Sequence, residues 1–265
     1  MTMTTNSTFI NGSDSYGQTM YTSIEEMWAS EGVVTGNDNS DWYERAAVYY
    51  EEHCDPTVDG VLGGFSHITD LDVEFSLQFV TRVQEDRPGL EWTIACECGA
   101  GIGRVSKGLL LPLGVIRCDL IESSEKLLSE APVFIGDKES SRCRYYCQGL
   151  QTWMPKEHEY SIIWIQWVLC YLTDEDIVAF LKRCGTALTD HGIIVMKENV
   201  CEGNTFVLDK DDASVTRSLS YWLSLIEDAG LRVVRQEVQT NFPEELFPVP
   251  MLALEVDPKN KWIAF

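Results

Sequence analysis

The sequence has few cations and no long apolar run. Lysine and arginine together number 20, against 42 aspartates and glutamates, and the formal net charge is −22. A surface this negative repels phosphate backbones and anionic lipids, which argues against direct nucleic-acid or membrane binding and favours a basic partner. The longest apolar stretch, residues 162–172, is interrupted by Gln166 and is much shorter than the ~20 residues of a membrane-spanning helix.

The sequence also lacks a basic N-terminal region and any metal-ligand motif. Its first lysine or arginine is Arg45, so we find neither the positive region of a secretory signal nor the arginines of a transit peptide. The nine cysteines form no CxxC pair and fall mostly in apolar runs, which is typical of reduced, buried thiols in an intracellular protein. The four histidines are scattered, so we expect no bound metal.

The amino-acid composition of the chain changes near residue 41. Residues 1–40 are rich in Ser, Thr, Asn and Gly and predict a mobile extension, with one short helix at 23–29 that could dock through Met27 and Trp28. Residues 41–90 predict a helical lid, with helices over 41–53 and 72–83 around a Gly-rich loop at 59–69. We expect one domain over 41–265.

From residue 92 apolar strands alternate with helices. The predicted strands are 92–98, 115–122, 144–149, 160–167, 192–198, 231–238 and 251–256. The predicted helices are 104–111, 123–131, 174–188 and 214–230. Because the strands are continuously apolar, they indicate a mostly parallel sheet covered on both faces. The fold class that we expect is therefore α/β and Rossmann-like, with seven strands flanked by helices and an N-terminal helical extension.

The first predicted strand ends in a glycine turn over residues 99–103. Glycine lets the backbone turn tightly and lets a ligand approach closely. The spacing is GxGxG rather than GxGxxG, so the turn alone is a weak signal. Glu97 precedes it, Arg104 follows it, and Glu122 ends the second strand, where a carboxylate commonly holds a ribose diol. This combination is similar to the S-adenosylmethionine (SAM) pocket of class I methyltransferases, and we favour SAM over NAD.

Longer strings resemble one family, the eukaryotic α-N-terminal protein methyltransferases, also called N-terminal Xaa-Pro-Lys N-methyltransferases. The similarity runs from about Tyr43 to Val256, through PTVDGVLGGFSHI, CGAGIGRVSKGLLLPL, GLQTW, IWIQWVLCYLTD, GIIVMKEN and VLDKDDASVTRS. The resemblance implies SAM-dependent methylation of the free α-amine of proteins that begin Xaa-Pro-Lys or Xaa-Pro-Arg, with S-adenosylhomocysteine (SAH) as product. It also implies basic substrates such as ribosomal proteins or histone-like tails, and, with the missing signals, a cytoplasmic or nuclear location.

The resemblance assigns roles to individual residues. Those implied to bind the cofactor, Gly101 of the turn included, are Gly99, Gly101, Arg104, Glu122, Leu150, Gln151 and Gln166. Those implied to bind the substrate peptide are Leu62, Gly63, Trp167, Asp209, Ser214, Tyr50 and Phe247. Asp212 would hold the substrate amine and receive or relay its proton, while Asn199 would orient that amine. Tyr171 stands where several relatives carry a histidine that assists deprotonation, and Tyr50 and Phe247 replace a tryptophan and a tyrosine.

The residues themselves leave alternatives open. Asp211, Asp212 and Ser214 precede a predicted helix and would serve equally as its caps, and Gln151 and Gln166 as caps of strand ends. Only one of Trp164 and Trp167 is expected to face the pocket, since strand side chains three apart point to opposite faces.

For the function, two alternatives stay open. One is a SAM-dependent methyltransferase of small amines, and the other is a non-catalytic SAM-binding protein, which the substitutions at Tyr50, Tyr171 and Phe247 suggest. A nucleic-acid amino-methyltransferase is disfavoured because residues 165–168 read Ile-Gln-Trp-Val rather than Asn/Asp-Pro-Pro-aromatic.

Overall fold

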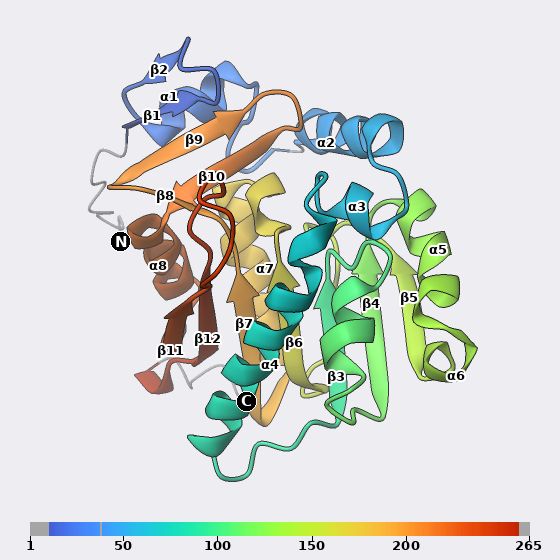
Figure 1. Ribbon diagram of the computed structural model, residues 1–265. Helices are drawn as coiled ribbons and strands as arrows, with labels where there is room; N and C mark the ends of the chain where they lie inside the picture. Colours follow the sequence, from blue (N-terminus) through green and yellow to red (C-terminus); the bar gives the residue numbers. More distant parts are fainter. Residues whose placement is uncertain (1–10, 38, 260–265) are drawn as a thin grey trace.

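A seven-stranded sheet forms the centre of the protein, in a computed structural model that describes residues 11–37 and 39–259 (Figure 1). Its strand order is β11-β12-β7-β6-β3-β4-β5. The strands are β3 (Ile94–Cys98), β4 (Arg117–Glu122), β5 (Cys143–Cys147), β6 (Tyr160–Gln166), β7 (Leu188–Lys197), β11 (Leu231–Val238) and β12 (Pro250–Val256). Strands β3 to β7 pair in parallel, and β12 pairs antiparallel with both β7 and β11. The predicted α/β class and mostly parallel seven-stranded sheet are confirmed.

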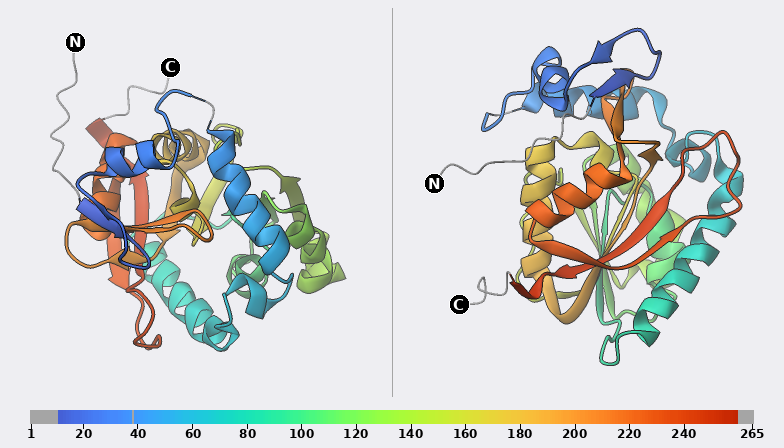
Figure 2. Two further views of the ribbon diagram at one scale, coloured as in Figure 1. Left: turned by 90° about the horizontal axis from the view of Figure 1, so that it is seen from above. Right: turned by 90° about the vertical axis from the view of Figure 1, so that its left-hand side faces the viewer.

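Helices cover both faces of this sheet (Figure 2). One face packs against α4 (Thr69–Glu85), the π-helix η2 (Ser106–Leu110) and α5 (Glu125–Ile135), and the other against α7 (Asp174–Ala187) and α8 (Leu219–Asp228). Alternate residues of β6 divide between the two cores: Ile162 and Trp164 face α4, while Ile163 and Ile165 face α7. A strand with both faces buried must be apolar throughout, which explains the unbroken hydrophobic runs of the sequence. The short helix α6 (Asp137–Ser140) follows α5.

A second, smaller sheet lies above the large one and includes the N-terminal segment (Figure 1). Its strands are β1 (Asn11–Asp14), β2 (Met20–Tyr21), β8 (Val200–Cys201), β9 (Thr205–Asp209) and β10 (Ser214–Ser218). Strand β1 pairs in parallel with β9, and helix α1 (Ile24–Ser30) follows β2. Within residues 1–40, predicted to be a mobile extension, residues 11–37 form β1, β2 and α1, and residues 1–10 lie outside the described part.

The docking of α1 explains why the polar segment is placed on the domain. Met27 and Trp28 are buried, and the indole of Trp28 packs edge-on against Trp42 with ring centroids 5.0 Å apart. The Nε1 of Trp28 also donates a hydrogen bond to Asp174 at the start of α7 (2.8 Å). Two large side chains thus supply the apolar area that the Ser- and Asn-rich flanks lack.

The helix predicted over 214–230 is wrong in its first turn, because residues 214–218 form β10. This strand pairs antiparallel with β9 and buries Val215 and Arg217 on one face, a period of two that suits its β-branched residues. Helix α8 begins only after Ser218, whose hydroxyl accepts from the backbone N–H of Tyr221 (3.4 Å). Asp212 and Ser214 therefore lie in and beside a hairpin turn, and their interpretation as helix caps is wrong.

Three elements at the start of the segment predicted to be a lid, residues 41–90, lie over the carboxyl ends of the parallel strands (Figure 1). They are α2 (Ser40–His53), α3 (Val58–Val61) and the 3-10 turn η1 (Ser66–Ile68), which leads into α4. Among residues 11–37 and 39–259, no helix combines the length and apolarity needed to cross a bilayer.

Candidate active site

A cavity of about 660 Å³ lies where the parallel strands end beneath the lid. Its volume falls within the ~300–1,000 Å³ that is typical of small-molecule sites, and parallel α/β sheets bind ligands at this edge. The walls come from the ends of β3, β4 and β6, from the loops that follow these strands and β5, and from α2 and α3. All the residues implied to bind the cofactor line it, namely Gly99, Gly101, Arg104, Glu122, Leu150, Gln151 and Gln166.

The glycine turn and Glu122 form one rigid corner of this cavity. Gly99 and Gly101 have φ values of 69° and 53°, in the left-handed region that favours glycine, and a Cβ on Gly99 would lie 2.5 Å from the side chain of Val168. The carboxylate of Glu122 accepts from the backbone N–H groups of Gly101 and Ser124, each at 2.9 Å. A carboxylate accepts about four hydrogen bonds, and the Ser123 hydroxyl is a third donor to Glu122 at 3.4 Å. Glu122 therefore keeps capacity for one hydroxyl of a ribose, and for both once the Ser123 hydroxyl turns away. This corner fits a nucleoside.

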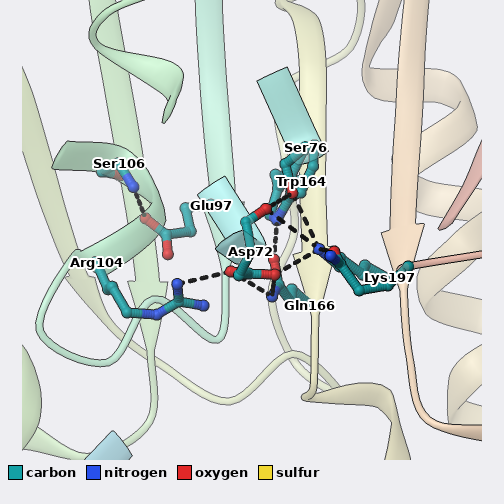
Figure 3. A network of polar contacts seen from close by, with 9 residues as sticks. Asp72, Ser76, Glu97, Arg104, Ser106, Trp164, Gln166 and Lys197 are labelled. Carbon is teal, nitrogen blue, oxygen red and sulfur yellow. Dashed lines mark hydrogen bonds and ion pairs between the residues drawn. The ribbon is translucent and has the colours of Figure 1, made fainter. Parts of the chain in front are cut away.

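A buried network of polar side chains closes the opposite wall (Figure 3). Nη1 of Arg104 lies 2.7 Å from Oδ2 of Asp72, and Nε2 of Gln166 lies 2.9 Å from Oδ1 of the same carboxylate. Oε1 of Gln166 accepts from Nε1 of Trp164 (2.9 Å). The simple capping interpretation of Gln166 is therefore wrong, because its amide joins this network instead.

Asp72 is the residue of this wall that the sequence reasoning missed. In the sequence it resembles an ordinary acidic residue in the first turn of a helix, yet it is buried, with 1 % of its surface exposed. A signal was available: Asp72 and Ser76 continue the stripe of Phe79, Val80 and Val83, the buried face of α4. An aspartate on an apolar helix stripe needs a partner, since a buried charge without one is costly.

Glu97 is also buried at the cavity wall. One carboxylate oxygen accepts from the backbone N–H of Ser106 (2.7 Å), which anchors the start of the π-helix to the end of β3. Burial raises the pKa of Glu97 to about 7, while the Ser106 hydrogen bonds and the charge of Arg104 oppose the shift.

A second polar cluster joins three segments that are distant in the sequence. The hydroxyls of Tyr50, from α2, and Tyr171, from η3 (Leu169–Tyr171), lie 2.5 Å apart. The hydroxyl of Tyr171 donates to Oδ2 of Asp212 (3.3 Å), so its only proton is used and Tyr50 must donate to Tyr171. Oδ1 of Asp212 is buried and has no hydrogen-bond partner among the described residues. Burial raises the pKa of Asp212, although the nearby polar groups of Ser214 and the hydroxyl of Tyr171 oppose the shift.

Trp167 presents a fixed aromatic plane between these two clusters. It follows the last residue of β6 and has a φ of 53°, which is rare for a bulky side chain and is held here by its neighbours. The next two backbone N–H groups, of Val168 and Leu169, both donate to Oε1 of Glu198 at 2.9 Å. Nε1 of Trp167 is buried without a partner in the described chain, so it is a donor available to a ligand.

Atoms of both Trp164 and Trp167 adjoin the cavity, but Trp164 is fully buried in the core that packs against α4 and donates to Gln166. Strand alternation does not apply to the pair, because β6 ends at Gln166 and Trp167 belongs to the turn.

The residues implied to bind the peptide divide into three groups. Tyr50, Leu62, Trp167 and Tyr171 line the cavity, and Gly63 adjoins Leu62 with a φ of 57°. Asp209 and Ser214 are paired residues at the end of the β9–β10 hairpin, beside Asp212. Asn199 is half-buried and directly follows Glu198. These last three residues and Asp212 do not line the cavity, although Asp212 contacts Tyr171, which does.

Phe247 is the residue that the structure does not bring to the site. It is 43 % exposed, and Phe242 from the same loop lies against Trp167 instead, with ring centroids 6.4 Å apart. The loop between β11 and β12 has no periodic pattern, so the sequence offered no means of choosing between the two phenylalanines.

Cys98 lines the cavity, whereas the other cysteines and the four histidines do not. All nine cysteines are free thiols, and six of them are buried. Over residues 11–37 and 39–259, we find no group of three or more His, Cys, Asp or Glu side chains that could hold a metal ion.

Comparison with known proteins gives one consistent result. Residues 38–255 match the model of a family described as AdoMet dependent proline di-methyltransferase. The chain is 40% identical over 251 residues to the alpha N-terminal protein methyltransferase 1 of Dictyostelium discoideum, covering 92% of this chain and 91% of the relative. It is 39% identical to the human N-terminal Xaa-Pro-Lys N-methyltransferase 1 over 218 residues, 82% of this chain and 96% of the relative. A SAM-dependent methyltransferase structure from Leishmania major superposes with a TM-score of 0.82 at 38% identity, covering 93% of this chain and 96% of that one.

Proposed function

The chain belongs to the AdoMet-dependent proline di-methyltransferase family, and we propose that it methylates the free α-amine of proteins that begin Xaa-Pro-Lys or Xaa-Pro-Arg. The predicted SAM-dependent methyltransferase activity is confirmed by this membership. The observation that carries the substrate assignment is the buried, unpartnered oxygen of Asp212 beside the cavity, because it is an acceptor suited to an amine.

The cofactor-binding side of the cavity is suited to holding the two ends of SAM. Glu122 has free acceptor capacity for the ribose diol, and Arg104 offers a cation for the methionyl carboxylate. SAM supplies a methyl group already activated on a sulfonium, so the protein's own work is to position the acceptor and to exclude water. The lid helix α2 contributes to this exclusion, since Tyr43, Ala46 and Tyr50 line the cavity.

The substrate side must bring the amine to a neutral state. A protein α-amine has a pKa of ~7.7–8.0 and is partly protonated at neutral pH. Asp212 can hold the ammonium through Oδ1 and receive or relay its proton, while Tyr171 occupies Oδ2. Because burial raises the pKa of Asp212, its pKa moves closer to that of the amine, which favours the transfer.

The remaining contacts suit a proline followed by a cationic residue. The plane of Trp167 at the cavity wall would provide an apolar surface for proline at position two, and Asn199 would orient the amine. Asp209 at the end of the hairpin can pair with the lysine or arginine at position three.

Basic proteins are the substrates that the charge favours. The net charge of −22 attracts cationic N-terminal segments at long range, so we propose ribosomal proteins and histone-like tails, met in the cytoplasm or nucleus. Microscopy of a tagged chain would test the location, and methylation of purified basic proteins would test the targets.

A peptide panel tests the proposed reaction. The enzyme is incubated with SAM and Xaa-Pro-Lys, Xaa-Pro-Arg, Xaa-Ala-Lys and N-acetylated Xaa-Pro-Lys peptides, and the products are located by tandem mass spectrometry. We expect methyl on the α-amine of the first two peptides, weak turnover of the third and none of the acetylated control. Methylation of small amines with no peptide turnover would support a metabolite methyltransferase, and SAH binding with no turnover at all would support a non-catalytic protein.

A further inference from the structure

Asp72 joins three elements at the wall of the cavity (Figure 3). Its carboxylate lies 2.7 Å from Nη1 of Arg104, after the glycine turn, and 2.9 and 3.1 Å from Nε2 of Gln166, at the end of β6. It also pairs with the ammonium of Lys197, at the end of β7. Asp72 itself comes from α4, whose first turn follows the lid, so four segments meet at one carboxylate.

The partners of Asp72 are as buried as the carboxylate itself. The exposed fractions are 1 % for Asp72, 0 % for Lys197 and 6 % for Arg104, so water screens these charges little. Burial opposes ionisation of Asp72, yet Lys197 and Arg104 hold its pKa below the ordinary value. Without the negative charge, two cations would face each other in a buried site at a large electrostatic cost.

The network leaves Gln166 and Arg104 little freedom of orientation. Oε1 of Gln166 accepts from Trp164 and its Nε2 donates to Asp72, so the amide cannot flip without losing both bonds. Arg104 uses Nη1 for Asp72 and lies with its guanidinium 5.7 Å from the ring centre of Trp167. Both side chains nevertheless line the cavity, so the faces that they show to a ligand are set by Asp72.

We propose that Asp72 is a positioning residue for cofactor binding, which fixes Arg104 and Gln166 in the orientation that recognises the methionyl end of SAM. Asp72 does not line the cavity, so it acts through these two side chains rather than by touching the ligand. The inference rests on the proposed function, because it assumes that the cavity binds SAM. A pre-oriented guanidinium loses less conformational freedom on binding, and this gain appears in the affinity for the cofactor.

Asp72→Asn tests the role with a side chain of the same shape. We expect SAH to bind about 10- to 100-fold more weakly in isothermal calorimetry, the loss that removing an outer-shell partner causes at metal sites. At saturating SAM, the KM for an Xaa-Pro-Lys peptide should stay near that of the wild type.

Asp119→Asn is the matched control, because Asp119 is another carboxylate with 1 % exposure. It pairs with Arg117 at 2.8 Å and accepts from Tyr160, but it lies in β4 away from the cavity lining. We expect this variant to lose stability in urea unfolding and to keep its affinity for SAH.

The double variant Asp72→Asn/Lys197→Met separates positioning from stability, since it also removes the cation that Asp72→Asn leaves unpaired. We expect it to recover urea stability but not SAH affinity, because Arg104 still lacks its carboxylate. The proposal is overturned if Asp72→Asn binds SAH as tightly as the wild type, or if the double variant regains affinity together with stability. A wild-type chain that binds no SAH would refute the proposed function itself, and this result is distinct from either of those.

Discussion

The hydroxyl of Tyr171 lies 3.3 Å from Oδ2 of Asp212, while the other oxygen of Asp212 is buried and has no partner in the described chain. The carboxylate accepts in this contact, so the proton of Tyr171 is used there, and the hydroxyl of Tyr50, 2.5 Å from that of Tyr171, donates to it. Each hydroxyl proton thus points along the chain toward the carboxylate, and Oδ1 is left as the acceptor for a substrate amine. The resemblance to the family implies a histidine at this position in several relatives, and in this chain the hydroxyl of Tyr171 contacts Asp212 instead.

Asp212→Asn should abolish most turnover while the cofactor still binds. An amide cannot accept the proton of the substrate ammonium, and a positioned general base contributes about 10²- to 10⁴-fold to a rate. Initial rates with an Xaa-Pro-Lys peptide would show the loss, and calorimetry with SAH would show unchanged binding, since Asp212 does not line the cavity. Near-normal activity would refute the role of Asp212.

Tyr171→Phe should move the acid limb of the pH–rate profile to higher pH. The hydroxyl donates to the ionised form of Asp212 and so lowers its pKa, against the effect of burial. Removing the donor raises that pKa further, so the carboxylate becomes protonated, and inactive as a base, at a higher pH than in the wild type. The measurement is kcat/KM from pH 5 to 9, with Tyr50→Phe as the companion variant.

Tyr171→His tests the same position with the residue that the resemblance implies for several relatives. If the histidine speeds methylation or moves the pH optimum, the side chain at 171 takes part in handling the amine. An unchanged profile in both position-171 variants would mean that the Tyr171 contact with Asp212 is structural only.

Asp209→Lys should raise the KM for the peptide and leave SAH affinity unchanged. Asp209 pairs with Ser214 at the tip of the hairpin, half-buried and outside the cavity. Losing a hydrogen bond to a charged group costs about 1.5–3 kcal/mol, which corresponds to roughly 10- to 100-fold in KM. A peptide with glutamate at position three should reverse the preference. An unchanged KM would place recognition of position three elsewhere.

The sequence predicted the large sheet well and the substrate hairpin poorly, for a physical reason. Strands such as β6 are buried on both faces, so they are unbroken apolar runs. Strand β10 is short, and the apolar pattern of α8 follows it directly, so the two were read as one helix. Five residues are too few to show the period of two of a strand beside α8, whose buried Tyr221, Trp222, Leu225 and Ile226 recur at the spacing of a helix.

The site was predictable to the extent that its residues adjoin recognisable turns. Glu97, Arg104 and Glu122 flank the glycine turn and the end of the next strand, and all three line the cavity. Asp72 was not predictable in this way, because its partner Lys197 is 125 positions away and only the fold brings them together.

The stability of the folded state should fall as the pH rises from about 4.5 to 7. Burial raises the pKa of both Glu97 and Glu198 from 4.5 to about 7, so in this window the unfolded chain binds fewer protons than the folded one. Ionisation of each glutamate therefore lowers the free energy of unfolding by roughly 3 kcal/mol by pH 7. Asp14 stabilises the folded state as the pH rises, because its folded-state pKa is lowered to about 2. This effect falls at a pH below the window of the two glutamates.

In Glu97→Gln, the free energy of unfolding should therefore fall less between these pH values, by about the contribution of one glutamate. Urea unfolding at pH 5 and pH 7.5 measures the difference in the free energy of unfolding for each chain. If the variant and the wild type lose equal stability between the two pH values, Glu97 does not titrate in this window.

Gly12→Val should weaken peptide binding from a position far from the cavity. Gly12 lies in β1 opposite Phe206 of β9, and a Cβ at Gly12 would lie 2.5 Å from the backbone oxygen of Phe206. Because a backbone atom cannot give way as a flexible side chain can, β1 must move away from β9, at a cost of about 1–3 kcal/mol. Strand β9 carries Asp209 at its end, and Tyr16 of the segment after β1 donates to Asp211 of the same hairpin (2.5 Å). We therefore expect lower stability in urea and a higher peptide KM, with SAH affinity unchanged.

Ser13→Ala is the matched control for this variant, since its side chain points to the other face of β1 and leaves the contact with Phe206 intact. It should keep the wild-type KM. A normal peptide KM for Gly12→Val, in a chain whose stability has fallen, would mean that the hairpin holds its substrate geometry without the N-terminal strand. A raised KM restricted to Gly12→Val would instead make the segment before residue 38, where the family match begins, part of the substrate-binding apparatus of this chain.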